Sequence, residues 1–104
     1  MERAKSSFVY CIHDKTTKRS KIGVAADPEA RLRRLQTGCP TRLKLVDYFA
    51  GGRYVERAFL HNYHHRRVFM HHRVSEWMKD DDGVVMSNFL SLADSWTPSS
   101  IIGG

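Results

Sequence analysis

The sequence is poor in cysteine and contains no long apolar run. Its two cysteines, Cys11 and Cys39, have neither the number nor the spacing of a disulfide framework or a zinc site. The longest apolar stretches cover a few residues, whereas a helix that crosses a bilayer needs about 20. No basic-then-apolar leader precedes the first cysteine. We therefore expect a reduced, cytoplasmic protein that is not inserted in a membrane.

Acidic residues are few relative to basic ones. Eleven Asp and Glu stand against 17 Lys and Arg, which gives a formal net charge of +6 and a pI near 9.7. So high a positive charge on a small chain predicts a polyanionic partner. The alternative is that the excess positive charge only keeps the protein soluble. The length of 104 residues allows one hydrophobic core, and 41% apolar residues are enough to fill it.

The first half of the chain has the clearest secondary-structure signals. Residues 8–12 and 21–25 are rich in strand formers and flank a basic polar segment, which predicts a β-hairpin even though its loop has no Asn-Gly or Asp-Gly. Asp27, Pro28 and an acidic residue then mark a helix start before residues 30–36. Gly38 and Pro40 predict where this helix ends.

The second half predicts further elements of both kinds. Residues 43–49 favour a third strand, residues 54–64 a second helix and residues 84–96 a third helix. Residues 66–78 are mixed and partly extended in character. The fold class expected is α+β, with a small, antiparallel, three-stranded sheet flanked by helices. We expect one domain over residues 1–104, with a core at about 8–96 and a flexible tail at 97–104.

Two short motifs on the predicted hairpin carry a family resemblance. Phe8-Val9-Tyr10 and Lys21-Ile22-Gly23 resemble the two motifs of the GIY-YIG nucleases, and the 11 positions from Tyr10 to Lys21 are similar to the usual gap. The family also places an arginine in the next helix and a glutamate in a later helix, where this chain has Arg31 and Glu56. The resemblance implies an endonuclease that hydrolyses phosphodiester bonds in nucleic acid, most simply DNA.

The chain also resembles a small phage and bacterial branch of that family. The shared segments, which extend the resemblance over residues 8–78, are Lys21-Ile22-Gly23, Asp27 to Arg31, Leu35 to Gly38, Glu56 with Leu60-His61, and Glu76-Trp77. Two departures stand out: Phe8 replaces the glycine of the first motif, and Lys21 replaces the tyrosine of the second. Because other members also carry lysine there, we interpret Lys21 as a variant of an active site.

The chemistry of these side chains matches the reaction. Tyr10 is the expected general base, and Lys21 is expected to lower its pKa as a neighbouring ammonium. The guanidinium of Arg31 suits two phosphate oxygens, and Glu56 is expected to hold one Mg²⁺ or Mn²⁺ ion in a one-metal mechanism. Each of these residues alone would be read as a packing residue or a solvated charge, so the hypothesis depends on their joint pattern.

Other charged residues are expected around this centre. His61 is a candidate helper for the leaving group, although His61 and His65 at i and i+4 also suggest a zinc site, which we consider the weaker hypothesis. Glu76-Trp77 is expected to pair and pack. The residues expected to contact the nucleic-acid backbone are Lys18, Arg19, Arg33, Arg34, Arg66, Arg67 and Arg73, with the histidines His64, His65, His71 and His72 near the last three.

Two other functions are open from the sequence. One is a non-catalytic nucleic-acid-binding module of the same fold, and the other is a regulatory protein whose positive charge meets an acidic protein partner. No separate recognition domain is visible, so sequence selectivity should be weak. Cutting both strands of a duplex would then require a homodimer or two successive nicks.

Overall fold

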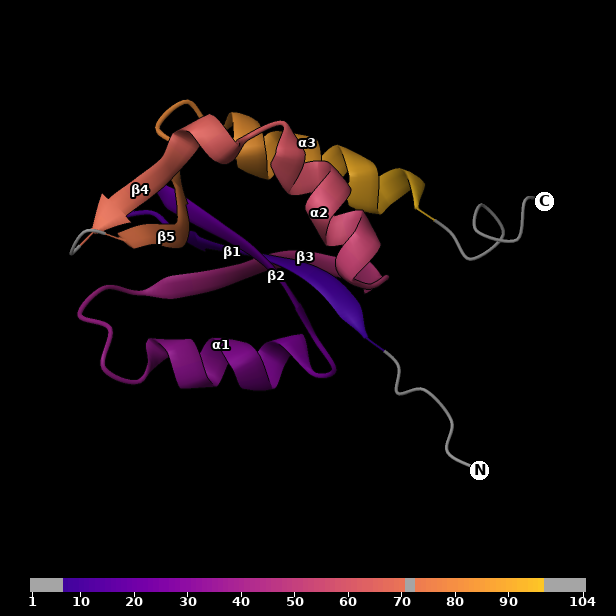
Figure 1. Ribbon diagram of the computed structural model, residues 1–104. Coiled ribbons are helices and arrows are strands. Elements are labelled where there is room, and N and C mark those ends of the chain that lie inside the picture. The colour runs from indigo at the N-terminus through magenta and orange to yellow at the C-terminus, as the bar shows by residue number, and fades with distance from the viewer. Residues whose placement is uncertain (1–6, 71–72, 97–104) are drawn as a thin grey trace.

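The chain folds into one antiparallel sheet with helices on both faces (Figure 1). The computed structural model describes residues 7–70 and 73–96, without the side chains of residues 69, 70 and 73–75. The predicted tail at 97–104 and the histidines His71 and His72 lie outside the described residues. The α+β class expected from the sequence is confirmed.

The hairpin at the start of the chain forms as predicted. Strands β1 (Phe8–Asp14) and β2 (Arg19–Ala25) pair antiparallel, with Tyr10 opposite Gly23 and Ile12 opposite Lys21. The turn contains no Asn-Gly, and instead Lys18 adopts a left-handed conformation with φ of 57°. The carboxylate of Asp14 accepts hydrogen bonds from the backbone N–H groups of Thr16 and Thr17, which stabilises this basic turn.

The three predicted helices are also present in the described part of the chain. Helix α1 spans Pro28–Gln36, and the side chain of Asp27 caps it by accepting a hydrogen bond of 3.1 Å from the Ala30 N–H. Helix α2 spans Arg53–His61, which is shorter than expected because a 3-10 turn, η1 (His64–Arg66), follows it. Helix α3 spans Val84–Ser95.

The prediction of a three-stranded sheet is wrong in its strand number. Strand β3 (Leu43–Ala50) is where it was expected, but the segment considered mixed contains two further strands, β4 (Arg67–Met70) and β5 (Arg73–Lys79). The five strands are ordered β3-β1-β2-β5-β4. Lys21 of β2 lies opposite Trp77 of β5, so the hairpin that carries both motifs is central in the sheet.

The core lies on both faces of the sheet, which explains the continuous apolar run in β1. Val9 and Cys11 face the side covered by α2 and α3, where they pack with Phe89. Tyr10 and Ile12 point to the opposite side, which α1 covers (Figure 1). Alternate residues of a strand point to opposite faces, so a strand covered on both sides must be apolar throughout. No helix in the described part is both long and apolar enough to cross a membrane.

Candidate functional site

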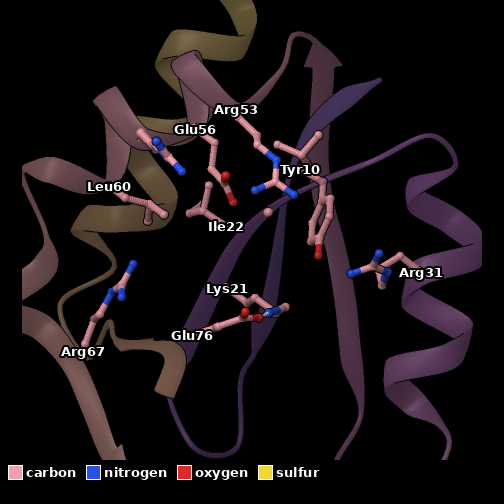
Figure 2. A pocket seen from close by; sticks show the side chains of 12 residues that line it. Tyr10, Lys21, Ile22, Arg31, Arg53, Glu56, Leu60, Arg67 and Glu76 are labelled. Atoms are coloured by element: carbon pink, nitrogen blue, oxygen red, sulfur yellow. Dashed lines mark hydrogen bonds and ion pairs between the residues drawn. The ribbon is translucent and has the colours of Figure 1, made fainter. Parts of the chain in front are cut away.

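A cavity of about 440 Å³ brings the predicted site residues together. We call it the central cavity. Tyr10 from β1, Lys21 from β2, Arg31 from α1 and Glu56 from α2 all line it (Figure 2). The remaining lining residues are Ile22, Gly23, Val24, Arg53, Arg57, Leu60, Arg67 and Glu76. Residues that are scattered over the sequence thus meet in a single polar hollow.

Tyr10 is fully buried, yet its hydroxyl has no hydrogen-bond partner among the described residues. A buried polar atom is usually paired, and an unpaired one costs free energy. The ring lies at the edge of the cavity, and Arg31 reaches toward it from α1 (Figure 2). Burial raises the pKa of Tyr10, and the positive charge of Arg31 offsets part of this rise. The site thus holds a buried, unpaired phenol hydroxyl close to a guanidinium.

Lys21 is engaged with a partner that the sequence did not reveal. Its ammonium is buried and forms an ion pair with the carboxylate of Glu76 on β5. The prediction of a lowered pKa for Tyr10 is wrong, because burial raises that pKa, and Arg31 is the cation that acts most strongly against the rise. Glu76 does pair, as expected, and the ion pair lowers the pKa of its carboxyl group.

Glu56 is half-buried on α2, and its carboxylate points into the central cavity (Figure 2). Burial raises the pKa of Glu56, while the cations Arg53, Lys21 and Arg57 lower it and Glu76 raises it further. Glu76 is therefore a second carboxylate near Glu56, where the sequence had suggested only one. In the described residues, no group of three or more His, Cys, Asp and Glu side chains is arranged to hold a metal ion.

Two charged lining residues, Arg53 and Arg57, were missed by the sequence reasoning. A signal for Arg53 existed, because it precedes Glu56 by three positions and residues at that spacing share a face of a helix. Glu76 was identified only as a pairing residue, since its approach to Lys21 depends on the pairing of β5 with β2.

The expected nucleic-acid contacts are spread over several surfaces. Arg67 lines the central cavity, whereas Lys18 and Arg19 lie at the turn of the hairpin. Arg66 makes two hydrogen bonds, of 2.8 and 3.0 Å, with the carboxylate of Asp82, so its charge is partly neutralised. The exposed residues Arg33 and Arg34 are on α1, and the side chain of Arg73 lies outside the described residues.

His61 is not among the residues that line the central cavity. It is exposed at the last position of α2, and its ring lies 6.3 Å from that of His64. The structure thus brings together Tyr10, Lys21, Arg31 and Glu56, and it leaves His61 at the surface.

Gly23 makes room for the buried Tyr10 ring. A Cβ atom added to Gly23 would lie 2.6 Å from Cζ of Tyr10 and even closer to its hydroxyl oxygen. We expect Gly23→Ala to destabilise the fold by about 2 kcal/mol, because neither the strand nor the ring can move freely. Chemical denaturation should show this loss. The loss should shrink when it is measured in a Tyr10→Leu background, and an equal loss in both backgrounds would contradict the packing explanation.

Comparison with known families identifies the fold unit that holds this site. The profile of the T5orf172 domain matches residues 7–91, a segment that includes all five strands and every residue that lines the central cavity. Comparison with curated proteins and with solved structures gave no match. The family match covers far more than half of the chain, and the chain therefore belongs to the T5orf172 domain family.

Proposed function

We propose that this protein is a GIY-YIG-type endonuclease that hydrolyses phosphodiester bonds in nucleic acid, with DNA as the expected substrate. The observation that carries the proposal is the convergence of Tyr10, Lys21, Arg31 and Glu56 on the central cavity. The T5orf172 family is associated with endonuclease-like proteins of phages and bacteria, which supports a nuclease-related role.

The cations of the cavity would bind the phosphate. Arg31 of α1, Arg67 of β4 and Arg53 of α2 line the central cavity from different elements. A guanidinium offers parallel N–H donors that match two phosphate oxygens, and it stays charged at any ordinary pH. These residues would hold the phosphodiester and stabilise the negative charge that grows on it during hydrolysis.

The carboxylate of Glu56 is the residue that would hold a divalent metal ion. Mg²⁺ and Mn²⁺ favour oxygen ligands, and Mg²⁺ commonly takes only one or two carboxylates, with water and phosphate oxygens as its other ligands. Glu56 alone fits this donor set, whereas the described residues offer no group of three or more ligands. A bound ion would neutralise phosphate charge and make a coordinated water more acidic. It would also relieve the cost of keeping Glu56 ionised in a half-buried place.

Tyr10 would act as the general base in its phenolate form. It would take a proton from the attacking water, whose oxygen bonds to phosphorus while the bond to the leaving oxygen breaks. Because the pKa of Tyr10 is raised, the phenolate is scarce at neutral pH. The cleavage rate should therefore rise with pH into the alkaline range and not level off early. Lys21 is better placed than His61 to stabilise the leaving oxygen, since Lys21 lines the cavity.

A panel of labelled substrates tests the proposed function. Duplex DNA, branched DNA, single strands and RNA should be incubated with Mg²⁺, with Mn²⁺ and with EDTA, and we expect metal-dependent cleavage of at least one DNA substrate. Salt-dependent binding without any cleavage would favour a non-catalytic nucleic-acid-binding module. Stronger binding to an acidic polypeptide than to nucleic acid would favour a regulatory protein.

The two arginines Arg31 and Arg34 provide a matched comparison on α1. Both carry one positive charge, but Arg31 lines the central cavity and Arg34 is exposed outside it. We expect Arg31→Ala to lower the single-turnover cleavage rate by about a hundredfold, as the loss of a donor to the transition state does. Arg34→Ala should cost only a few-fold, through weaker attraction of the substrate. Equal losses would mean that Arg31 contributes only general electrostatic attraction.

A further inference from the structure

The ion pair between Lys21 and Glu76 connects a buried side chain with an exposed one. The side chain of Lys21 is 6% exposed, whereas that of Glu76 is 78% exposed. Lys21 is fixed on β2, a strand with a neighbour on each side in the sheet, and both residues line the central cavity. The lysine is therefore a fixed, buried cation, and the glutamate is a partner that can move into water.

A buried ammonium needs an anion beside it. Removing a charge from water costs free energy that only a close counter-charge recovers, so a Lys21 without a partner would be strongly unfavourable. Glu76 provides this counter-charge in the free protein. A phosphodiester in the central cavity carries the same negative charge and could provide it equally well, because its oxygens can accept the same hydrogen bond.

The surroundings of Glu76 also suit a phosphate. Arg31 and Arg67 line the same cavity, and their positive charges act on the Glu76 carboxylate together with that of Lys21. The pKa of Glu76 is lowered by its hydrogen bond to Lys21, so the side chain is ionised at neutral pH. Figure 2 shows Glu76 and Lys21 together below Tyr10, with Arg31 and Arg67 on opposite sides. An anion thus already lies among the cations that the proposed function assigns to the substrate.

We propose that Glu76 is an internal substitute for the substrate phosphate, which neutralises Lys21 in the free protein and gives way when a phosphodiester enters the central cavity. This inference rests on the proposed function, because it assumes that the cavity binds a phosphodiester. The exchange leaves Lys21 paired in both states. Glu76 therefore competes with the substrate, and it makes binding weaker than the cations alone would allow.

Glu76→Gln tests this competition, because glutamine keeps the shape of the side chain and removes its charge. The dissociation constant of a fluorescent single-stranded oligonucleotide should be measured by anisotropy in EDTA, so that cleavage does not interfere. We expect Glu76→Gln to bind about fivefold more tightly than the wild type, a change in the range of a single partly exposed ion pair. Glu29→Gln, an equal change of charge on the exposed surface of α1, should alter binding by less than about twofold.

A second background separates exchange at Lys21 from a general effect of charge. In a Lys21→Met background, Glu76→Gln should no longer tighten oligonucleotide binding, because the ammonium for which Glu76 and the phosphate compete is gone. An equal gain in both backgrounds, or a Glu76→Gln variant that binds no more tightly than Glu29→Gln, would overturn the inference. If Lys21→Met does not fold, as circular dichroism would reveal, the comparison of Glu76→Gln with Glu29→Gln decides alone.

The same measurements distinguish this inference from the proposed function. A wild-type protein that binds no oligonucleotide would overturn the proposed function and the inference with it. Wild-type binding that Glu76→Gln does not strengthen would overturn the inference and leave the proposed function intact.

Discussion

Glu56→Gln should lower the single-turnover cleavage rate by at least about a hundredfold, since it removes the carboxylate proposed to hold the metal ion. The substitution keeps the size of a half-buried side chain, so the fold should be retained. Binding of nucleic acid should be equal or tighter, because a negative charge disappears from among Arg53, Arg57 and Lys21. Cleavage rates at saturating Mn²⁺ or Mg²⁺, together with anisotropy measurements of binding, would test both expectations.

Glu29→Gln is the matched control for this variant. It removes the same charge from the exposed surface of α1, outside the central cavity, and its cleavage rate should stay within about twofold of the wild type. A Glu56→Gln variant that retains full activity would refute the assignment of the metal site. A variant that loses activity and binding together would instead indicate a disturbed fold.

Tyr10→Phe should lower the cleavage rate by about a thousandfold, within the range of general acid–base catalysis, without loss of stability. The hydroxyl that it removes is buried and has no hydrogen-bond partner among the described residues, so its removal costs the fold no bond. Stability should be unchanged or higher, because a buried unpaired polar group is unfavourable. This combination is unusual for a change to a fully buried residue, and it separates a catalytic role from a packing role.

The pH dependence of stability gives Tyr10→Phe a second readout. The pKa of Tyr10 is raised by burial above its ordinary value of 10.0. The neutral phenol is therefore favoured in the folded state, and its contribution to stability is complete below about pH 10 and is lost as the pH rises toward the folded-state pKa. The wild type should lose stability in this alkaline range, and Tyr10→Phe should lose less.

Tyr54→Phe is the control for both measurements on Tyr10. Tyr54 is 90% exposed on α2 and does not line the central cavity. Its replacement should change neither the cleavage rate nor the alkaline stability. If Tyr10→Phe retained activity with the pH profile of the wild type, Tyr10 would not be the general base.

The parts of the fold that could be predicted are those with local signals. Asp27, Pro28 and Gly38 mark α1 within a single stretch of sequence, and the structure has the helix there. Strand β5 carries no such signal, since it pairs with the distant strand β2, where Lys79 lies opposite Arg19, and β4 joins the sheet only through β5. Only the folded sheet could reveal that the mixed segment completes it.

The candidate site was predictable to the same extent. Tyr10 and Lys21 were found through the spacing of two motifs on one hairpin, and Arg31 and Glu56 through their places in the following helices. The partner of Lys21 was not found, because it lies on β5. The wrong prediction for the pKa of Tyr10 has the same origin, since a sequence does not state how deeply a strand residue is buried or which cation is nearest.

The position of β5 in the chain also bears on when the candidate site is complete during synthesis. The ion pair of Lys21 and Glu76 connects residues that are 55 positions apart. A nascent chain that has left the ribosome only as far as α2 already contains Tyr10, Lys21, Arg31 and Glu56, but it lacks the strand that borders β2. Until β5 is made, Lys21 lacks its ion-pair partner Glu76, and the central cavity lacks the lining residue that β5 contributes. We therefore expect the proposed activity to appear only after β5 has been synthesised.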